Sequence, residues 1–187
     1  MMAGMPVQAG WEGRYYEDFA AGDVYRHPLG RTLSEADNTW FTLLTMNTNQ
    51  IHFNVEYARR SEFNRPLIVS TFTLALAVGQ SVTDLSQNAF ANLGFDEVRF
   101  THPVFAGDTL WSESVVLDKR ESQSRRHAGI VGVRTRSLNQ HGNEVLSFRR
   151  SFYVYKRGAP QVTDAFPEPE QPIDVDRDRD RDREQAE

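Results

Sequence analysis

The residues best suited to chemistry lie in one polar loop, which reads Asn-Thr-Asn-Gln-Ile-His from Asn47 to His52. His52 carries an imidazole, a group that can both accept and donate a proton, so it is the candidate acid/base of the loop. Asn47 and Asn49 carry amides, which hydrogen-bond a water or a substrate but do not accept a proton. Structural roles stay open beside this one: Asn47 as the C-terminal cap of a preceding helix, and Asn49 as a residue that stabilises the loop.

A long apolar segment follows this loop, from Ser70 to Leu85. Its apolar residues occur on every side of a helix, which predicts a helix surrounded by protein, with Ser70 or Thr71 as its N-cap. The unpaired amide groups at its start should face the loop that carries His52. The segment is shorter than the roughly 20 apolar residues of a membrane span, so we expect no membrane partner.

The remaining patterns predict two short helices and a set of strands. A capping box at Ser34 and Asp37 predicts a helix over 34–46, and Asn54 is expected to cap a second helix over 55–61. The expected strands are 24–32, 89–104, 109–117, 129–138 and 145–156. A hairpin loop over 139–143 is expected between the last two strands. One buried helix with an antiparallel sheet predicts an α+β fold.

The chain of 187 residues fits one domain with two appendages. We expect a flexible N-terminus over 1–13, a single domain over 14–158 and a disordered charged tail over 159–187, where Asp and Arg alternate from Asp176. Residues 160–187 carry a net charge of −6 and the rest of the chain +1, which together give the net charge of −5. No strong positive field is left to attract nucleic acid, so we expect no such partner.

The chain has no cysteine, which excludes disulfides and thiol nucleophiles, and we expect a cytoplasmic location. The start of the sequence has neither the basic nor the apolar region of a secretory signal. The other histidines have no ligands at metal-binding spacing, so we expect no metal site; they are His27, His102, His127 and His141.

Three segments in this order resemble the MaoC-like (R)-specific enoyl-CoA hydratases of the hot-dog superfamily. They are the 47–52 loop, the sequence Pro-Leu-Ile-Val-Ser-Thr over 66–71, and the sequence Val-Arg-Phe-Thr-His-Pro-Val-Phe-Ala-Gly-Asp-Thr-Leu over 98–110. The resemblance runs from about Tyr15 to Lys156. It implies a curved antiparallel sheet wrapped around a central helix, and a homodimer or higher homo-oligomer with acyl-CoA bound near the interface.

The resemblance also implies a reaction, the reversible addition of water to a 2-enoyl-CoA by a hydro-lyase. The family pattern has Asp where this chain has Asn47, and often His-Gly where this chain has Val69-Ser70. We therefore expect His52 to be the principal acid/base, Asn47 to orient the water, and the Ser70 amide to stabilise the thioester oxygen. No cofactor is expected beyond the coenzyme A that the substrate carries.

Further residues near the loop are candidates for binding the substrate or its coenzyme A: Asn49, Arg59, Arg60, Arg65 and Thr71. Arginines suit phosphates and carboxylates, although exposed arginines usually bind neither. The altered loop resembles the branch that acts on short branched or dicarboxylic enoyl-CoAs, such as mesaconyl-, itaconyl- or methylglutaconyl-CoA.

Two other functions compete with a hydratase. A thioesterase on the same fold needs a carboxylate to activate water at the thioester carbon, and Glu62 or Asp84 could supply it if either reached the pocket. A non-catalytic acyl-CoA-binding subunit would explain the loss of the family's Asp. A pocket without a carboxylate near His52 would favour that subunit.

Overall fold

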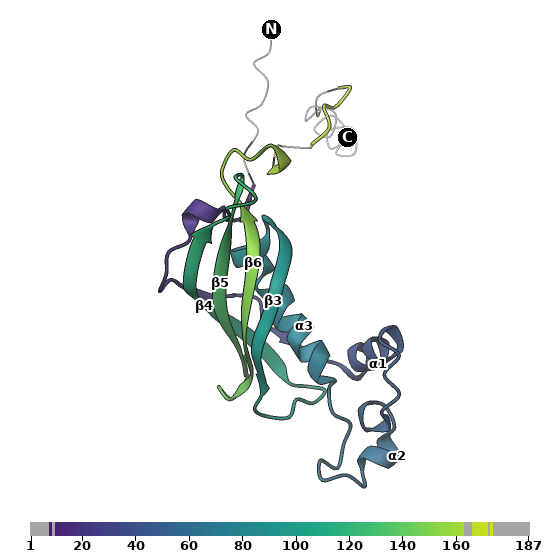
Figure 1. The fold of residues 1–187 in the computed structure, drawn as a ribbon. Coiled ribbons are helices and arrows are strands. Elements are labelled where there is room, and N and C mark those ends of the chain that lie inside the picture. Colours follow the sequence, from purple (N-terminus) through teal and green to yellow (C-terminus); the bar gives the residue numbers. More distant parts are fainter. Residues whose placement is uncertain (1–7, 9, 163–165, 172, 174–187) are drawn as a thin grey trace, which may run out of the picture.

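The computed structural model describes residues 8, 10–162, 166–171 and 173. At its centre an antiparallel sheet lies against helix α3 (Ser70–Gln80), and two smaller helices lie beyond the N-terminal end of α3 (Figure 1). Most of the predicted charged tail over 159–187 and much of the predicted flexible N-terminus fall outside the described residues, so both stay predictions. At the start of the tail, Pro160–Val162 forms a short 3₁₀ helix. Within the described residues, no helix is both long enough and apolar enough to cross a membrane.

The sheet has the strand order β1-β4-β5-β6-β3, and β2 also pairs with β4. All its pairings are antiparallel. The strands are β1 (Val24–Arg26), β2 (Arg31–Thr32), β3 (Ala89–Phe100), β4 (Thr109–Glu121), β5 (Ala128–Asn139) and β6 (Glu144–Tyr155). The four long strands and the α+β class agree with the prediction, and most residues of the inner strands β5 and β6 are buried.

The hydrogen bonds and backbone conformation of the turn between β5 and β6 confirm the predicted hairpin loop. The Asn139 side chain accepts hydrogen bonds from the backbone N–H groups of His141 and Asn143, each at 3.0 Å. Gly142 has a φ of 78°, a left-handed conformation that glycine adopts without a steric cost. The turn therefore fixes the register in which the two strands pair.

The core lies between α3 and the inner face of the sheet. Phe72 and Ala77 of α3 pack in one apolar cluster with Leu146 and Phe148 of β6, all nearly inaccessible to solvent. The prediction of a helix buried on every side is wrong for the single chain, because its face with Thr71, Ala75 and Gly79 is exposed. The exposed face of this largely apolar helix is therefore a surface that another chain can cover.

The predicted N-cap of α3 is also wrong. Val69 occupies the N-cap position, no side chain caps the helix, and Ser70 and Thr71 are its first two residues. The segment before it is instead held by tertiary hydrogen bonds: the N–H of Leu67 donates to the Ile51 carbonyl at 3.1 Å and that of Ile68 to the Val104 carbonyl at 2.9 Å.

Helices α1 (Glu35–Leu44) and α2 (Val55–Ala58) begin as predicted. Ser34 and Asp37 form a reciprocal capping box, in which the hydroxyl of Ser34 accepts the Asp37 N–H and a carboxylate oxygen of Asp37 accepts the Ser34 N–H. Asn54 caps α2 by accepting the N–H of Tyr57 at 3.1 Å. Both helices are shorter than predicted, and they place the polar loop between them.

The predicted strand over 24–32 is divided into β1 and β2. Between them His27 turns inward and is only 2% exposed, and Gly30 lies directly against the indole ring of Trp111. A Cβ at residue 30 would overlap that ring at 2.2 Å, so the close approach requires glycine. A buried polar group and a close approach interrupt the pairing where the sequence suggests continuity.

Candidate active site

His52 ends a short 3₁₀ helix, Gln50–His52, in the loop between α1 and α2. Asn49 starts this turn by accepting the N–H of Ile51 at 3.2 Å, which is the structural role that the sequence left open for it. The Nδ1 atom of His52 lies 3.0 Å from the carbonyl oxygen of Leu67. Because a carbonyl oxygen only accepts, Nδ1 carries the proton, and in the neutral ring Nε2 holds the free lone pair.

A cavity of about 220 Å³ is lined by His52 together with Glu35 and Arg65. Glu35 is the first residue of α1, and Arg65 lies in the segment that leads to α3. The Arg65 guanidinium carbon lies 3.7 Å from the centre of the Phe105 ring, which also lines the cavity. The cavity thus combines an acid/base, a carboxylate and a cation held by an aromatic face.

Asn38, on the buried side of α1, ties this region together. Its side-chain nitrogen donates to the carbonyl oxygens of His52 at 2.7 Å and of Leu67 at 2.8 Å, and its side-chain oxygen accepts the Val69 N–H at 2.9 Å. Neither Asn38 nor Glu35 was a sequence candidate. The helical pattern places both on the side of α1 that carries Thr42, but it does not show which segment of the chain they meet.

Asn47 lies in a different cavity, of about 430 Å³, that shares Thr39 and Phe53 with the His52 cavity. Its side-chain oxygen accepts the N–H of Asn49 at 3.0 Å, so that oxygen already has a donor. Its backbone N–H donates to the Thr42 carbonyl, while the preceding Met46 takes the left-handed conformation after the helix, at φ 55°. In the single chain Asn47 therefore closes α1 and shapes the loop beside His52.

Ser70 opens α3 beside a third cavity, of about 240 Å³, which shares Ile68 with the His52 cavity. Within residues 10–162 the backbone N–H groups of Ser70 and Thr71 have no hydrogen-bond acceptor. Free amides at the start of a helix favour an oxygen that gains negative charge. The structure thus keeps available the donor that the sequence assigned to Ser70.

The other predicted residues lie outside the His52 cavity. Arg59 pairs with Glu56 at 2.6 Å on the surface of α2, while Arg60 and Thr71 are exposed. Glu62 is exposed and does not line the His52 cavity. Asp84 lies at the far end of α3, where a carboxylate oxygen accepts a hydrogen bond from His27 at 2.8 Å. Neither of the carboxylates considered for a thioesterase therefore lines the His52 cavity.

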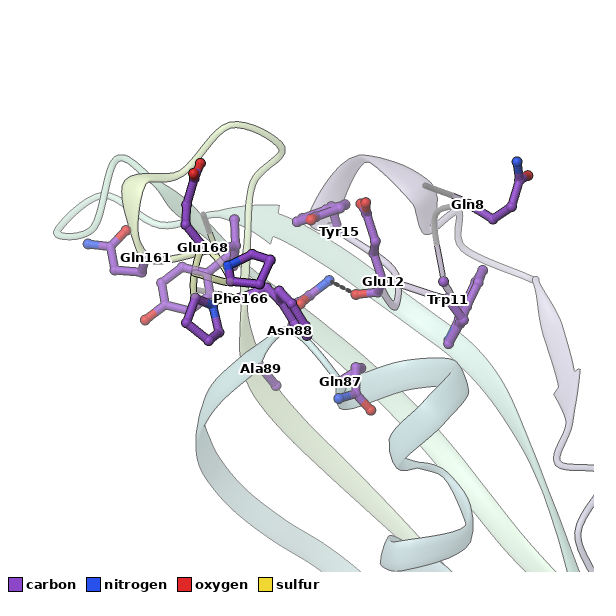
Figure 2. A pocket seen from close by; sticks show the side chains of 15 residues that line it. Gln8, Trp11, Glu12, Tyr15, Gln87, Asn88, Ala89, Gln161, Phe166 and Glu168 are labelled. Carbon is purple, nitrogen blue, oxygen red and sulfur yellow. Dashed lines mark hydrogen bonds between the residues drawn. The ribbon is translucent and has the colours of Figure 1, made fainter. Parts of the chain in front are cut away.

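A larger cavity, of about 1040 Å³, lies at that far end and includes Trp11, Asn88 and Phe166 (Figure 2). None of the predicted site residues lines it. Figure 2 also shows the Asn88 side chain directed at Glu12, whose carbonyl oxygen accepts its hydrogen bond at 2.9 Å. The predicted residues Ser70, His52 and Asn47 line the smaller cavities near the start of α3 instead. In the described residues, no three side chains of His, Asp or Glu are grouped to hold a metal ion.

Comparison with known proteins gives one family match, to the model described as mesaconyl-CoA hydratase, over residues 7–186. The mesaconyl-CoA hydratase of Cereibacter sphaeroides is 37% identical over 158 residues, which are 83% of this chain and 46% of that protein. This chain spans less than half the length of the first curated relatives that it matches.

Solved structures match the same region. A MaoC-like dehydratase from Rhodospirillum rubrum is 28% identical with a TM-score of 0.68, and the match covers 78% of this chain and 99% of that one. A Mycobacterium tuberculosis protein described as a double hot-dog fold has a TM-score of 0.72 at 23% identity, over 89% of this chain and 50% of that one. These matches confirm the predicted hot-dog fold.

Proposed function

The chain belongs to the mesaconyl-CoA hydratase family of MaoC-like hot-dog proteins, and from that premise we propose that it reversibly adds water to a short 2-enoyl-CoA. The proposed substrates are branched or dicarboxylic enoyl thioesters of the mesaconyl-CoA type. The activity is that of a hydro-lyase: the water oxygen bonds to the β-carbon and a proton is added at the α-carbon.

The observation that carries the proposal is the state of His52. Its Nδ1–H is engaged by the Leu67 carbonyl, which leaves the basic Nε2 for the cavity that His52 shares with Glu35 and Arg65. A base of this kind takes the proton from the attacking water and then returns a proton to the α-carbon. Glu35 supplies a carboxylate to this cavity. Asn47 cannot take that role, because its amide cannot accept a proton.

The thioester oxygen gains negative charge as water adds to the β-carbon. In the proposal this oxygen accepts hydrogen bonds from the free N–H groups at the start of α3, at Ser70 and Thr71. Asn47 orients the water through its side-chain nitrogen, since its oxygen is bonded to Asn49. A dicarboxylic substrate places its second carboxylate against Arg65, whose planar guanidinium suits a bidentate contact. Asn49, Arg59 and Arg60 keep the proposed role of binding the substrate or its coenzyme A.

The proposal extends to assembly and to the cell. We infer that the chain acts as a homodimer or a higher homo-oligomer. Among the described residues, the long strand β3 is paired on one side only, and the first curated relatives are about twice as long as this chain. No cofactor is proposed beyond the coenzyme A of the substrate, and the proposed location is the cytoplasm.

The test mixes the purified chain with mesaconyl-CoA and, separately, with crotonyl-CoA. Two signals are followed together, the absorbance of the conjugated thioester and the release of free thiol. A hydratase removes the absorbance without releasing thiol, and His52→Ala should lower the rate by about 10²–10⁴-fold. His141→Ala is the matched control, because His141 is exposed in the β5–β6 turn.

Other outcomes reject the proposal in different ways. Thiol release by the wild type but not by His52→Ala would identify a thioesterase. Binding of the CoA esters without turnover would identify a non-catalytic subunit. Glu35→Gln tests whether the Glu35 carboxylate accepts a proton in the reaction. If it does, the hydration rate of this variant should fall by at least about tenfold.

A further inference from the structure

We propose that Asn38 is a positioning residue that fixes both the tautomer and the place of His52. The inference rests on the proposed function in so far as His52 acts as the acid/base. Asn38 touches neither the substrate nor the reacting atoms, and it acts through the backbone groups that it holds.

The side-chain amide of Asn38 joins its own helix to two segments that are distant in the sequence. It bridges α1 to the His52 loop through the His52 carbonyl, and to the segment before α3 through the Leu67 carbonyl and the Val69 N–H. Both side-chain N–H groups are used, and the residue is only 3% exposed. No water can replace these bonds without a rearrangement, so their loss would leave buried polar groups unpaired.

The Leu67 carbonyl is the point through which Asn38 reaches the imidazole. This oxygen accepts two hydrogen bonds, from the Asn38 side chain at 2.8 Å and from Nδ1–H of His52 at 3.0 Å. A carbonyl held in one place gives Nδ1 a fixed acceptor, and so keeps the proton on Nδ1 and the lone pair on Nε2. If the carbonyl moves, the ring can take the other tautomer, in which Nε2 carries a proton and is no longer a base.

The same amide also places the start of α3. By accepting the Val69 N–H, Asn38 fixes the residue directly before the free amide of Ser70. Asn38 therefore sets the spacing between the base, which meets the water, and the helix amide, which meets the thioester oxygen. Small errors in such spacing slow a reaction strongly even when the substrate still binds.

Two substitutions separate this role from simple support of the fold. Asn38→Leu has a similar volume and makes none of the three hydrogen bonds. Asn38→Asp keeps an acceptor for the Val69 N–H but, when ionised, cannot donate to either carbonyl. Asn88→Leu is the matched control, because the Asn88 amide also donates to two backbone carbonyls, those of Glu12 and Arg14, at the opposite end of α3.

The first measurement is nitrogen NMR of the full chain labelled at its histidine rings, with His52 assigned through His52→Ala. The wild type should show a protonated Nδ1 and an unprotonated Nε2 at His52. Both Asn38 variants should show a mixture of the two tautomers, whereas Asn88→Leu should match the wild type. Wild-type ring signals in both Asn38 variants would overturn the inference.

The second measurement is the kinetics of hydration. We expect kcat to fall about 10–100-fold in both Asn38 variants, the usual cost of losing a group that orients an active side chain. KM should change by less than about threefold, because the substrate contacts remain. An equal fall in Asn88→Leu, or a rise in KM alone, would overturn the inference. If the wild type hydrates no enoyl-CoA, the proposed function fails, while the NMR signals still decide whether Asn38 sets the state of His52.

Discussion

In the proposed function, Arg65 is the residue that would distinguish a dicarboxylic substrate from a simple enoyl-CoA. It lines the His52 cavity, and its guanidinium rests on the Phe105 ring, so the cation is already oriented before a substrate arrives. Arg65→Leu should lower kcat/KM for mesaconyl-CoA by about 10–100-fold, the worth of a hydrogen bond to a charged group. The rate with crotonyl-CoA, which lacks the second carboxylate, should change little.

The control for this prediction is Arg120→Leu, which removes an exposed arginine at the end of β4. Steady-state kinetics with both thioesters decide the outcome. An equal loss for the two substrates would assign Arg65 to coenzyme A or to the fold and would remove the argument for a dicarboxylic substrate.

His27 should make the stability of the chain depend on pH. Burial lowers the pKa of His27 from its ordinary 6.5, against the opposing effect of Asp84, and Arg150 and Arg14 lower it further. The unfolded chain then binds more protons than the native chain between the lowered pKa and about 6.5. The contribution of His27 is therefore complete above that value and is lost as the pH falls below it.

Chemical unfolding at a series of pH values checks this expectation. The free energy of unfolding should decline from pH 7 towards pH 5 in the wild type, and the decline should be smaller in His27→Gln. His127→Gln is a control, because His127 is less buried and lies among Phe90 and Tyr155 on the sheet. Parallel declines in the wild type and His27→Gln would contradict the assignment.

Helix α1 is the element that carries the site, since it supplies Glu35 and Asn38 and ends beside Asn47. Its few buried residues give it little packing, so its cap should matter more than usual. The backbone N–H of Ser34 is the main cause that lowers the pKa of Asp37, which shows how closely the capping box is formed. Ser34→Ala should cost about 0.5–2 kcal/mol of unfolding free energy.

Denaturant titration of Ser34→Ala gives this loss, and Ser124→Ala, in the β4–β5 turn, controls for removal of a surface hydroxyl. If α1 frays before the sheet unfolds, amide exchange should increase first in 35–44 and in the His52 loop. Unchanged exchange there would mean that tertiary contacts, rather than the cap, hold α1.

The elements that the sequence predicts well are those fixed by neighbouring residues. The capping box at Ser34, the cap at Asn54 and the turn at Gly142 each depend on residues within four positions, so their patterns are readable. The N-cap of α3 is Val69 rather than Ser70 or Thr71, because long-range bonds to Asn38 and Val104 hold the segment that precedes the helix. Glu35 and Asn38 were missed for the same reason: their partners come from segments that only the fold brings together.

At the scale of the whole molecule, the single chain leaves two apolar surfaces uncovered. The edge strand β3 pairs only with β6 and exposes Leu93 and Val98. The end of α1 exposes Leu44 at 78% and Met46 at 87%, directly before the loop of the site. A long apolar edge strand is a ready place for another sheet to pair. The exposed face of α3, with Ala75, adds to the surface that a second chain would cover.

Pairing of two chains through β3 should therefore be sensitive to charge on this strand. Leu93→Lys and Val98→Lys together should shift the mass measured by light scattering from dimer towards monomer, because lysines on an edge strand oppose strand pairing. Leu117→Lys, at a similarly exposed position on β4, should leave the mass unchanged. If dimerisation completes the site, enoyl-CoA hydration should fall with the dimer fraction and recover at high protein concentration. A monomeric wild type would contradict dimerisation itself. A double variant that remains dimeric would contradict pairing through β3 and would point to the exposed end of α1 as the interface.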